Sequence, residues 1–151
     1  MTIRAGRRHG RGFRSVQGLP FDQQVARHVE KYKLRMELFM PLFVERFAEE
    51  LMFNTPVDTG LLRGSWLLGF HSNLRRAGVP DPTGTDTLNA MVARIGEWNP
   101  SRKIYFANSA PYSWWVEEGT NKMAPRYYIR KTVAAAPLIA EEVAQDILAT
   151  T

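Results

Sequence analysis

The sequence predicts an α+β fold with a long N-terminal helix, a four-stranded, mainly antiparallel sheet and a C-terminal helix packed on that sheet. Three observations support this prediction. Apolar residues recur at steps of three and four over residues 22–53, they alternate with a period of two from residue 61 onward, and helical spacing returns over residues 127–149. We therefore expect a helix, four strands and a second helix, in that order.

The first helix is expected over residues 22–53. Asp22 carries a side chain suited to an N-cap, and Gln23 and Gln24 follow it. Pro41 removes one backbone donor and costs about 3 kcal/mol in an unkinked helix. We expect a kink or a break near residues 40–41, with one continuous helix as the favoured outcome. The apolar stripe consists of Val25, Val29, Tyr32, Met36, Phe39, Leu42 or Phe43, Phe47 and Leu51.

A turn over residues 54–60 ends this helix, because Asn, Pro, Asp and Gly gather there. Pro56, Asp58, Thr59 and Gly60 are the structural residues predicted for the turn. Alternating apolar residues then predict four strands, over residues 61–71, 90–98, 103–108 and 112–117. Residues 99–101 are expected to form a hairpin connection. Residues 73–87 are expected to form a long loop, which is uncommon in a compact domain and often functional.

The closing helix is expected over residues 127–149, with Pro137 inside it. Its buried stripe is predicted to contain Ile129, Val133, Leu138 or Ile139, Val143 and Ile147. Because consecutive strands with short connections usually pair, an antiparallel sheet covered by helices on one face is expected.

The chain has 151 residues, which suits one domain, and it has no cysteine. The absence of cysteine excludes disulfides, thiolate zinc sites and cysteine nucleophiles. No apolar run approaches the roughly 20 residues that a membrane-spanning helix needs, and no apolar stretch follows the basic N-terminus. We therefore expect a soluble protein with no membrane partner, from a reducing compartment.

The net charge of +5 comes from the N-terminus. Residues 1–21 contain five arginines and no acidic residue, so the remaining residues carry equal numbers of basic and acidic side chains. We expect residues 1–21 to form a flexible arginine- and glycine-rich arm and residues 22–151 to form a single domain. The arm either orders against a partner protein or contacts DNA phosphates. The DNA contacts would be made by Arg4, Arg7, Arg8, Arg11 and Arg14.

No set of residues predicts an enzyme, a metal site or a cofactor. The segment Asp58-Thr59-Gly60 resembles the active-site triplet of aspartic proteases. That chemistry needs a second aspartate, which a chain this short would have to supply by forming a dimer, and those enzymes are nearly all-β. The three histidines lie far apart, and none stands at metal-ligand spacing. Glu117 and Glu118 lie close to Trp114 and Trp115 in the sequence, which would shield a carboxylate from water, yet pairing with an arginine such as Arg126 or Arg130 is the more usual role.

Aromatic residues predict a subunit contact. On a strand, Trp114 and Trp115 would point to opposite faces, so one ring would stay exposed unless both faces were covered. Tryptophan and tyrosine are the residue types that anchor protein interfaces.

Three segments, in two clusters over residues 55–65 and 110–130, then resemble a bacteriophage family. Residues 55–65 have the sequence Thr-Pro-Val-Asp-Thr-Gly-Leu-Leu-Arg-Gly-Ser, similar to the Pro-Val-Asp-Thr-Gly-x-Leu-Arg-x-Ser stretch of the neck or tail completion proteins of long-tailed phages. Residues 110–120 resemble that family's Tyr-Ala-x-x-Val-Glu-x-Gly-Thr element. Residues 124–130 resemble its Ala-Pro-Arg-Pro-Phe-hydrophobic-Arg segment, with Tyr127 in place of proline. The arginine arm and residues 73–87 are not part of the pattern.

The resemblance implies a non-enzymatic virion subunit that forms a ring around the DNA channel and joins the portal side of the capsid to the tail. The ring would be a hexamer or a dodecamer, and its partners would be further copies, the neighbouring neck proteins and DNA in the channel. The predicted subunit-contact residues are Trp114, Trp115, Glu117, Gly119, Thr120, Pro125, Arg126, Tyr127 and Tyr128. A tail terminator ring is the alternative, and a nucleic-acid-binding accessory protein that uses the arm is a further one.

Overall fold

The computed structural model describes residue 18 and residues 20–151. This part of the chain divides into two units, one ending at Leu34 and the other running over Arg35–Thr151. The elements are α1 (Phe21–Asn54), α2 (Leu61–Gly64), β1 (Trp66–Gly69), α3 (Thr85–Ile95), β2 (Tyr105–Asn108), α4 (Ser113–Glu118) and α5 (Tyr128–Thr150). Helix α1 begins in the first unit and ends in the second.

The predicted four-stranded sheet is wrong. The structure is 59% helical and contains a two-stranded antiparallel sheet. In this sheet Trp66 pairs with Asn108 and Gly69 pairs with Tyr105. Of the four predicted strands, residues 103–108 contain β2 and the middle of residues 61–71 contains β1, whereas residues 90–98 and 112–117 are mainly helical.

The segment predicted as one strand over residues 61–71 starts as a helical turn. Gly60 adopts a left-handed conformation, and the Ser65 hydroxyl donates to the Leu61 carbonyl at 2.6 Å, which closes the turn of α2. Strand β1 begins only at Trp66. The apolar alternation over residues 61–71 therefore spans two short elements, the helical turn α2 and the strand β1.

The segment predicted as a strand over residues 90–98 belongs to α3. Thr87, Met91 and Ile95 are its buried residues, and their spacing of four places them on one helical face. The same residues also fit alternation with Ala93, so periodicity alone did not decide between the two structures. Because α3 lies between β1 and β2, the hairpin expected at residues 99–101 is also wrong. The long loop is shorter than predicted, since residues 85–87 already belong to α3.

The fourth predicted strand is the short helix α4. Tyr112 and Val116 are half-buried with a spacing of four, and the Val116 amide donates to the Tyr112 carbonyl at 3.1 Å. Aromatic and β-branched residues favour strands intrinsically, but the contacts of Glu117 described below hold this segment in a helix.

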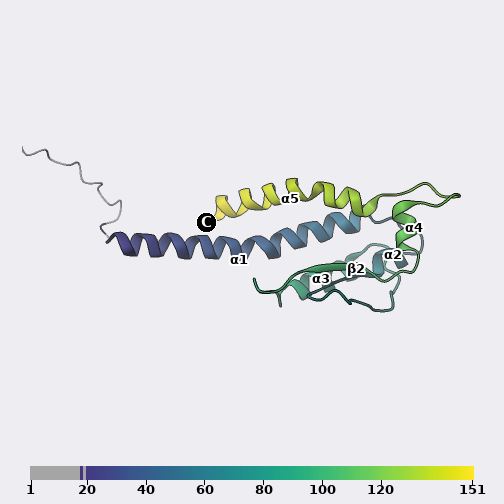
Figure 1. Ribbon diagram of the computed structural model, residues 1–151, viewed down its shortest axis with the longest axis horizontal. Helices are drawn as coiled ribbons and strands as arrows, with labels where there is room; N and C mark the ends of the chain where they lie inside the picture. Colours follow the sequence, from purple (N-terminus) through teal and green to yellow (C-terminus); the bar gives the residue numbers. More distant parts are fainter. Residues whose placement is uncertain (1–17, 19) are drawn as a thin grey trace, which may run out of the picture. The chain divides into compact units, whose positions relative to one another are not determined.

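Both long helices are confirmed. Helix α1 continues through Pro41 without a break, and α5 contains Pro137. However, α5 packs on α1 rather than on the sheet. Its buried residues Ile139, Val143 and Ile147 contact Phe39, Phe43 and Phe47 of α1, and Arg46 forms ion pairs with Glu142 and Asp146. Figure 1 shows the second half of α1 between α5 and the layer that contains the sheet and α3.

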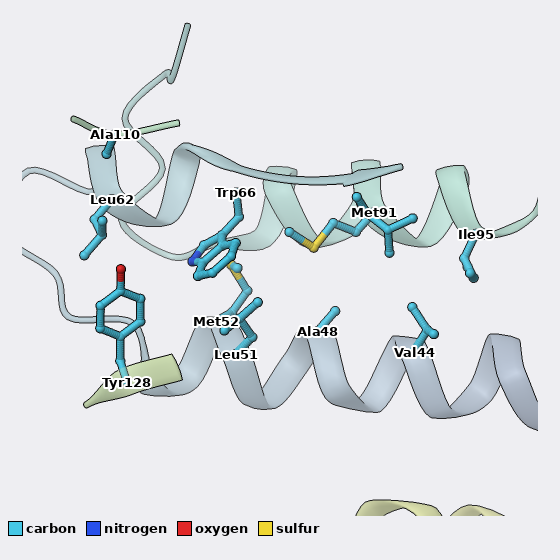
Figure 2. Close-up of a cluster of buried hydrophobic side chains, with 11 residues drawn as sticks. Val44, Ala48, Leu51, Met52, Leu62, Trp66, Met91, Ile95, Ala110 and Tyr128 are labelled. Atoms are coloured by element: carbon cyan, nitrogen blue, oxygen red, sulfur yellow. The ribbon is translucent and has the colours of Figure 1, made fainter. Parts of the chain in front are cut away.

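The main core lies on the other face of α1. In Figure 2, the side chains of Trp66, Met91 and Ile95 point toward α1. Phe106 of β2 extends this contact, because the centre of its ring lies 5.2 Å from the centre of the Phe47 ring. The residues of α1 in this core are Val44, Ala48, Leu51 and Met52. Helix α1 is thus the central support of the second unit, covered on two sides.

Glycines allow residues 78–82 to cross α2 at close range. A Cβ at Gly64 would lie 1.6 Å from the Val79 carbonyl oxygen, and one at Gly60 would lie 2.4 Å from the Pro82 nitrogen. Arg63 stabilises this crossing, because its guanidinium group donates to the Thr55 carbonyl at 3.1 Å and to the Pro82 carbonyl at 2.7 Å. This crossing fixes the turn between α1 and α2.

We expect Gly64→Ala to lower the free energy of unfolding by about 2–3 kcal/mol, because the added methyl group must displace a backbone carbonyl. Gly96→Ala is the matched control: its Cβ would approach only the Ala93 carbonyl oxygen, at 3.2 Å, and its effect should stay within about 1 kcal/mol. Urea denaturation of the full chain measures both values. Equal stabilities for the two variants would contradict the close crossing.

Asp81 holds the start of α3. Its carboxylate accepts hydrogen bonds from the Gly84 amide at 3.1 Å, the Thr87 amide at 2.9 Å and the Thr87 hydroxyl at 2.8 Å. Burial by itself raises the pKa of Asp81, but the hydrogen bonds from Thr87, Gly84 and Thr83 outweigh burial and lower it. The charged form therefore stabilises the fold.

Asp81→Asn is expected to lower the free energy of unfolding by about 1–2 kcal/mol at pH 7. Because the folded-state pKa of Asp81 is lowered, its contribution is present above an unfolded-state pKa of about 4 and is lost as the pH falls through the folded value. The gap between wild type and variant should therefore shrink below about pH 4. Urea denaturation at several pH values measures it, with the exposed Asp86→Asn as control. A gap that does not change with pH would contradict this account.

Candidate subunit-contact surface

The two sequence clusters that resemble the phage family meet in the structure. The turn between α1 and α2 and the segment formed by α4 and residues 119–127 line one depression, with a volume of about 270 Å³. Figure 1 shows α2 and α4 at the same end of the second unit. We call this feature the junction depression. Its lining includes Pro56, Val57, Asp58, Leu61, Tyr112, Val116, Met123 and Arg126.

The first wall is the turn over residues 55–60. Thr55 is fully buried; its hydroxyl donates to the Leu51 carbonyl at 2.6 Å and accepts the Trp66 indole N–H at 3.0 Å. Pro56 is half-buried, and Asp58 and Thr59 are exposed. The Thr59 hydroxyl accepts the Leu61 amide at 3.3 Å. The buried end of the turn is thus held in place while Asp58 faces solvent.

Glu117 supports the second wall from inside. It is buried, and its carboxylate accepts the backbone amides of Ile129 at 2.8 Å and Arg130 at 3.1 Å. These amides belong to the first turn of α5, whose own N-cap residue, Tyr127, makes no side-chain cap. Glu117 therefore caps α5 from α4. The ion pair to Arg130 that sequence reasoning considered is made instead by Glu118, at 2.6 Å.

Tyr128 is a second internal support. It is fully buried, and its hydroxyl donates to the Ser113 carbonyl at 3.1 Å. Its ring packs edge-on against the Trp66 ring, with 6.2 Å between the ring centres. Burial raises the pKa of Tyr128, and the nearby Glu117 raises it further. The structure thus places two of the predicted contact residues, Glu117 and Tyr128, in the interior.

Three of the four aromatic residues predicted at a subunit contact are exposed, and the fourth is the buried Tyr128. Trp114 is 66% exposed and Trp115 is 56% exposed, although they lie on a helix and not on opposite faces of a strand. Tyr127 is 38% exposed, and Arg130 lies over its ring at 4.8 Å. Val57 and Met123 add apolar area at the junction depression. We call Val57, Trp114, Trp115, Met123 and Tyr127 the junction surface.

The loop over residues 119–127 has a fixed backbone. Gly119 has φ 79°, and a Cβ there would lie 2.7 Å from the Pro125 nitrogen. Thr120 bridges to Met123, and the amides of Arg126 and Tyr127 donate to the Val116 and Glu117 carbonyls at 2.9 Å and 3.2 Å. These contacts connect the loop to α4, so the exposed residues of both segments are held together.

Sequence reasoning missed part of this site. Tyr112 and Val116 line the depression, and their spacing of four was the signal of a helix that would have placed them on one face. Arg63 was also missed, although it fastens the turn of the first wall. The five arginines predicted to contact DNA, from Arg4 to Arg14, lie outside the described residues.

The described residues contain no group of three or more His, Asp or Glu side chains that could hold a metal ion. In the same part of the chain, no helix combines the length and apolar character needed to cross a membrane. Comparison with protein-family models, curated proteins and solved structures found no match to this chain.

Glu117→Gln is expected to lower the free energy of unfolding by about 2 kcal/mol. The glutamine side chain is neutral, so its hydrogen bonds with the backbone amides of Ile129 and Arg130 are weaker than those of the carboxylate. Glu118→Gln is the matched control; its ion pair with Arg130 is partly exposed and should contribute less than about 1 kcal/mol. Chemical denaturation monitored by tryptophan fluorescence measures the difference. Similar losses in the two variants would show that Glu117 is not the cap of α5.

Proposed function

We propose that this chain is a structural, non-enzymatic subunit of the bacteriophage head–tail junction, which forms a ring around the DNA channel and joins the portal side of the capsid to the tail. The observation that carries the proposal is the meeting of residues 56–62 with residues from 112–126 at one depression. These are the segments whose sequences resemble the phage family, and they meet although about fifty residues separate them.

The exposed residues of α4, the helix whose Val116 lines the depression, support an assembly role. Trp114 and Trp115 are each more than half exposed on one six-residue helix. Large exposed aromatic side chains that gather on a rigid support are typical of interface anchors. A closed ring needs one face of each subunit to meet a different face of the next, and the junction surface is the face that we assign to one side of this contact.

The geometry of the Asp-Thr-Gly turn favours a structural role over a proteolytic one. Gly60 has a left-handed conformation and lies against Pro82, and its carbonyl accepts the Gly64 and Asp81 amides at 2.9 Å and 3.0 Å. Asp58 is exposed at the rim of the junction depression. Within residues 20–151, no second aspartate lines this depression, so the two aspartates that share a proton in an aspartic protease would have to come from two copies of the chain.

The experiment is complementation of a phage whose copy of this gene has been deleted. Without the subunit, we expect filled heads and free tails that stay unjoined in electron micrographs of lysates. The wild-type chain supplied in trans should restore joined virions. Normal virions from the deleted phage would overturn the proposal.

The variant Trp114→Ser/Trp115→Ser tests the junction surface. An interface anchor contributes about 2 kcal/mol or more, so this variant should weaken the contact between subunits about 30-fold or more. We therefore expect a lower yield of infectious phage and a smaller particle in light scattering. Both side chains are exposed, so the free energy of unfolding should change little. The control is Phe53→Ser, because Phe53 is 79% exposed but lies on α1 and not on α4. Wild-type yield from the double variant would contradict the assignment.

A further inference from the structure

Helix α1 has a side that packs against neither α5 nor the main core. In its second half, Phe39, Phe43 and Phe47 contact α5, and the buried residues of the main core lie on another face. Leu38 and Leu42 belong to neither contact, and they are 39% and 38% exposed. Two exposed leucines one turn apart indicate a surface that another helix can cover.

This side can be followed along the helix by its spacing. Because α1 is one helix over Phe21–Asn54, residues three or four positions apart lie on the same side of it. From residue 27 onward, steps of four, three, four, four, three and four residues connect a row of side chains, which we call the α1 stripe. Glu45 is half-buried, and the other members are exposed. The α1 stripe consists of Arg27, Lys31, Leu34, Leu38, Leu42, Glu45 and Glu49.

The order of residues in the stripe is symmetric about Leu38. A leucine stands four residues away on either side of it. At distances of seven and eleven residues, a basic residue precedes Leu38 and an acidic residue follows it. The basic residues are Lys31 and Arg27, and the acidic residues are Glu45 and Glu49. One end of the stripe is therefore positive and the other is negative, with leucines between them.

The opposite charges of the stripe cannot pair within one helix. Lys31 and Glu45 lie about 21 Å apart along the axis of α1, because each residue of a helix adds about 1.5 Å. Within the part of the chain that the structure describes, Lys31, Glu45 and Glu49 form no ion pair. The stripe therefore presents charges of both signs that a second molecule can neutralise.

We propose that the α1 stripe binds the α1 stripe of a second copy of this chain, with the two helices antiparallel and Leu38 on the two-fold axis. The partner's Leu42 then lies opposite Leu34, and the partner's Glu45 lies opposite Lys31. The leucines lose water at the centre of the contact, and the ion pairs at its two ends set the direction of the helices. A parallel pair would instead place Lys31 against the partner's Lys31.

A second copy is the partner that this pattern selects. In a two-fold contact the same patch occurs on both subunits, so a residue at a given distance before the axis meets the residue at that distance after it. A different protein would require no such symmetry in this chain. The stripe meets the requirement at each distance from Leu38, since leucine meets leucine once and a basic residue meets an acidic residue twice.

This contact is distinct from the contact that we assign to the ring. A closed ring joins one face of each subunit to a different face of the next, whereas the α1 stripe joins a face to itself. Trp114 and Trp115, the exposed residues of the ring contact, lie on α4. The dimer through α1 therefore goes beyond the proposed function and does not depend on it.

Cysteine cross-linking of the full chain tests the position of the two-fold axis. The chain has no cysteine, so one substitution introduces a single thiol. Under mild oxidation, Leu38→Cys should form a disulfide-linked dimer, because the two thiols meet at the axis. Met36→Cys is the control, since Met36 is 67% exposed but lies outside the stripe. Equal cross-linking of the two variants, or none with Leu38→Cys, would overturn the proposal.

A mixture of two variants tests the direction of the helices. Leu34→Cys chains and Leu42→Cys chains, one of them carrying an affinity tag, are combined in equal amounts and oxidised. In the antiparallel dimer these positions face each other, so the mixed disulfide should exceed the product of either variant alone by about tenfold. Efficient cross-linking of each variant with itself would show a parallel pair and overturn the proposal.

Charge reversal, followed by sedimentation equilibrium, tests the ion pairs. Lys31→Glu and Glu45→Lys each place two pairs of like charges in the dimer, so each should raise the dimer dissociation constant about tenfold. The double variant Lys31→Glu/Glu45→Lys restores opposite charges and should return within about threefold of the wild-type constant. Lys33→Glu, an exposed reversal outside the stripe, is the control and should have no such effect.

All of these constants are measured in the full chain that also carries Trp114→Ser/Trp115→Ser, so that the ring contact does not add to the association. A double charge variant that dissociates as readily as the single variants would overturn the proposal. A chain with the native stripe that stays monomeric up to a concentration of about 100 μM (about −5.5 kcal/mol) would overturn it as well.

Discussion

The capping of α5 by Glu117 is the interaction on which the candidate site depends. A buried carboxylate is unfavourable unless hydrogen bonds satisfy it, and here the amides of Ile129 and Arg130 do so at the positive end of a 23-residue helix. This contact fixes α4 against the start of α5. It also sets the direction of residues 119–127, because they must leave α4 and return within hydrogen-bonding distance of Val116 and Glu117. The exposed tryptophans of α4 are therefore placed by an internal charge.

The close crossing at Gly64 has the same role for the other wall of the depression. Residues 78–82 can pass over α2 only because Gly60 and Gly64 carry no side chain, and Asp81 then holds the start of α3. The turn, α2 and α3 are therefore coupled through one short crossing. Much of the family-like stretch over residues 55–65 is explained by this packing. Gly60 and Gly64 allow the crossing, Arg63 fastens it, and Ser65 closes the turn of α2.

The two long helices were predictable because their apolar stripes extend over many turns, and the predicted ends agree with α1 and α5 to within one residue. The short segments were not predictable, since four to eleven residues fit either period. Met91 and Ile95 suit a strand and a helix equally, and the choice depends on Asp81, which lies ten residues before Met91. For the site, the sequence predicted the exposed aromatic residues as contact residues, but it placed the buried residues that hold them in the same group. Glu117 and Tyr128 differ from their neighbours in burial, which depends on tertiary contacts.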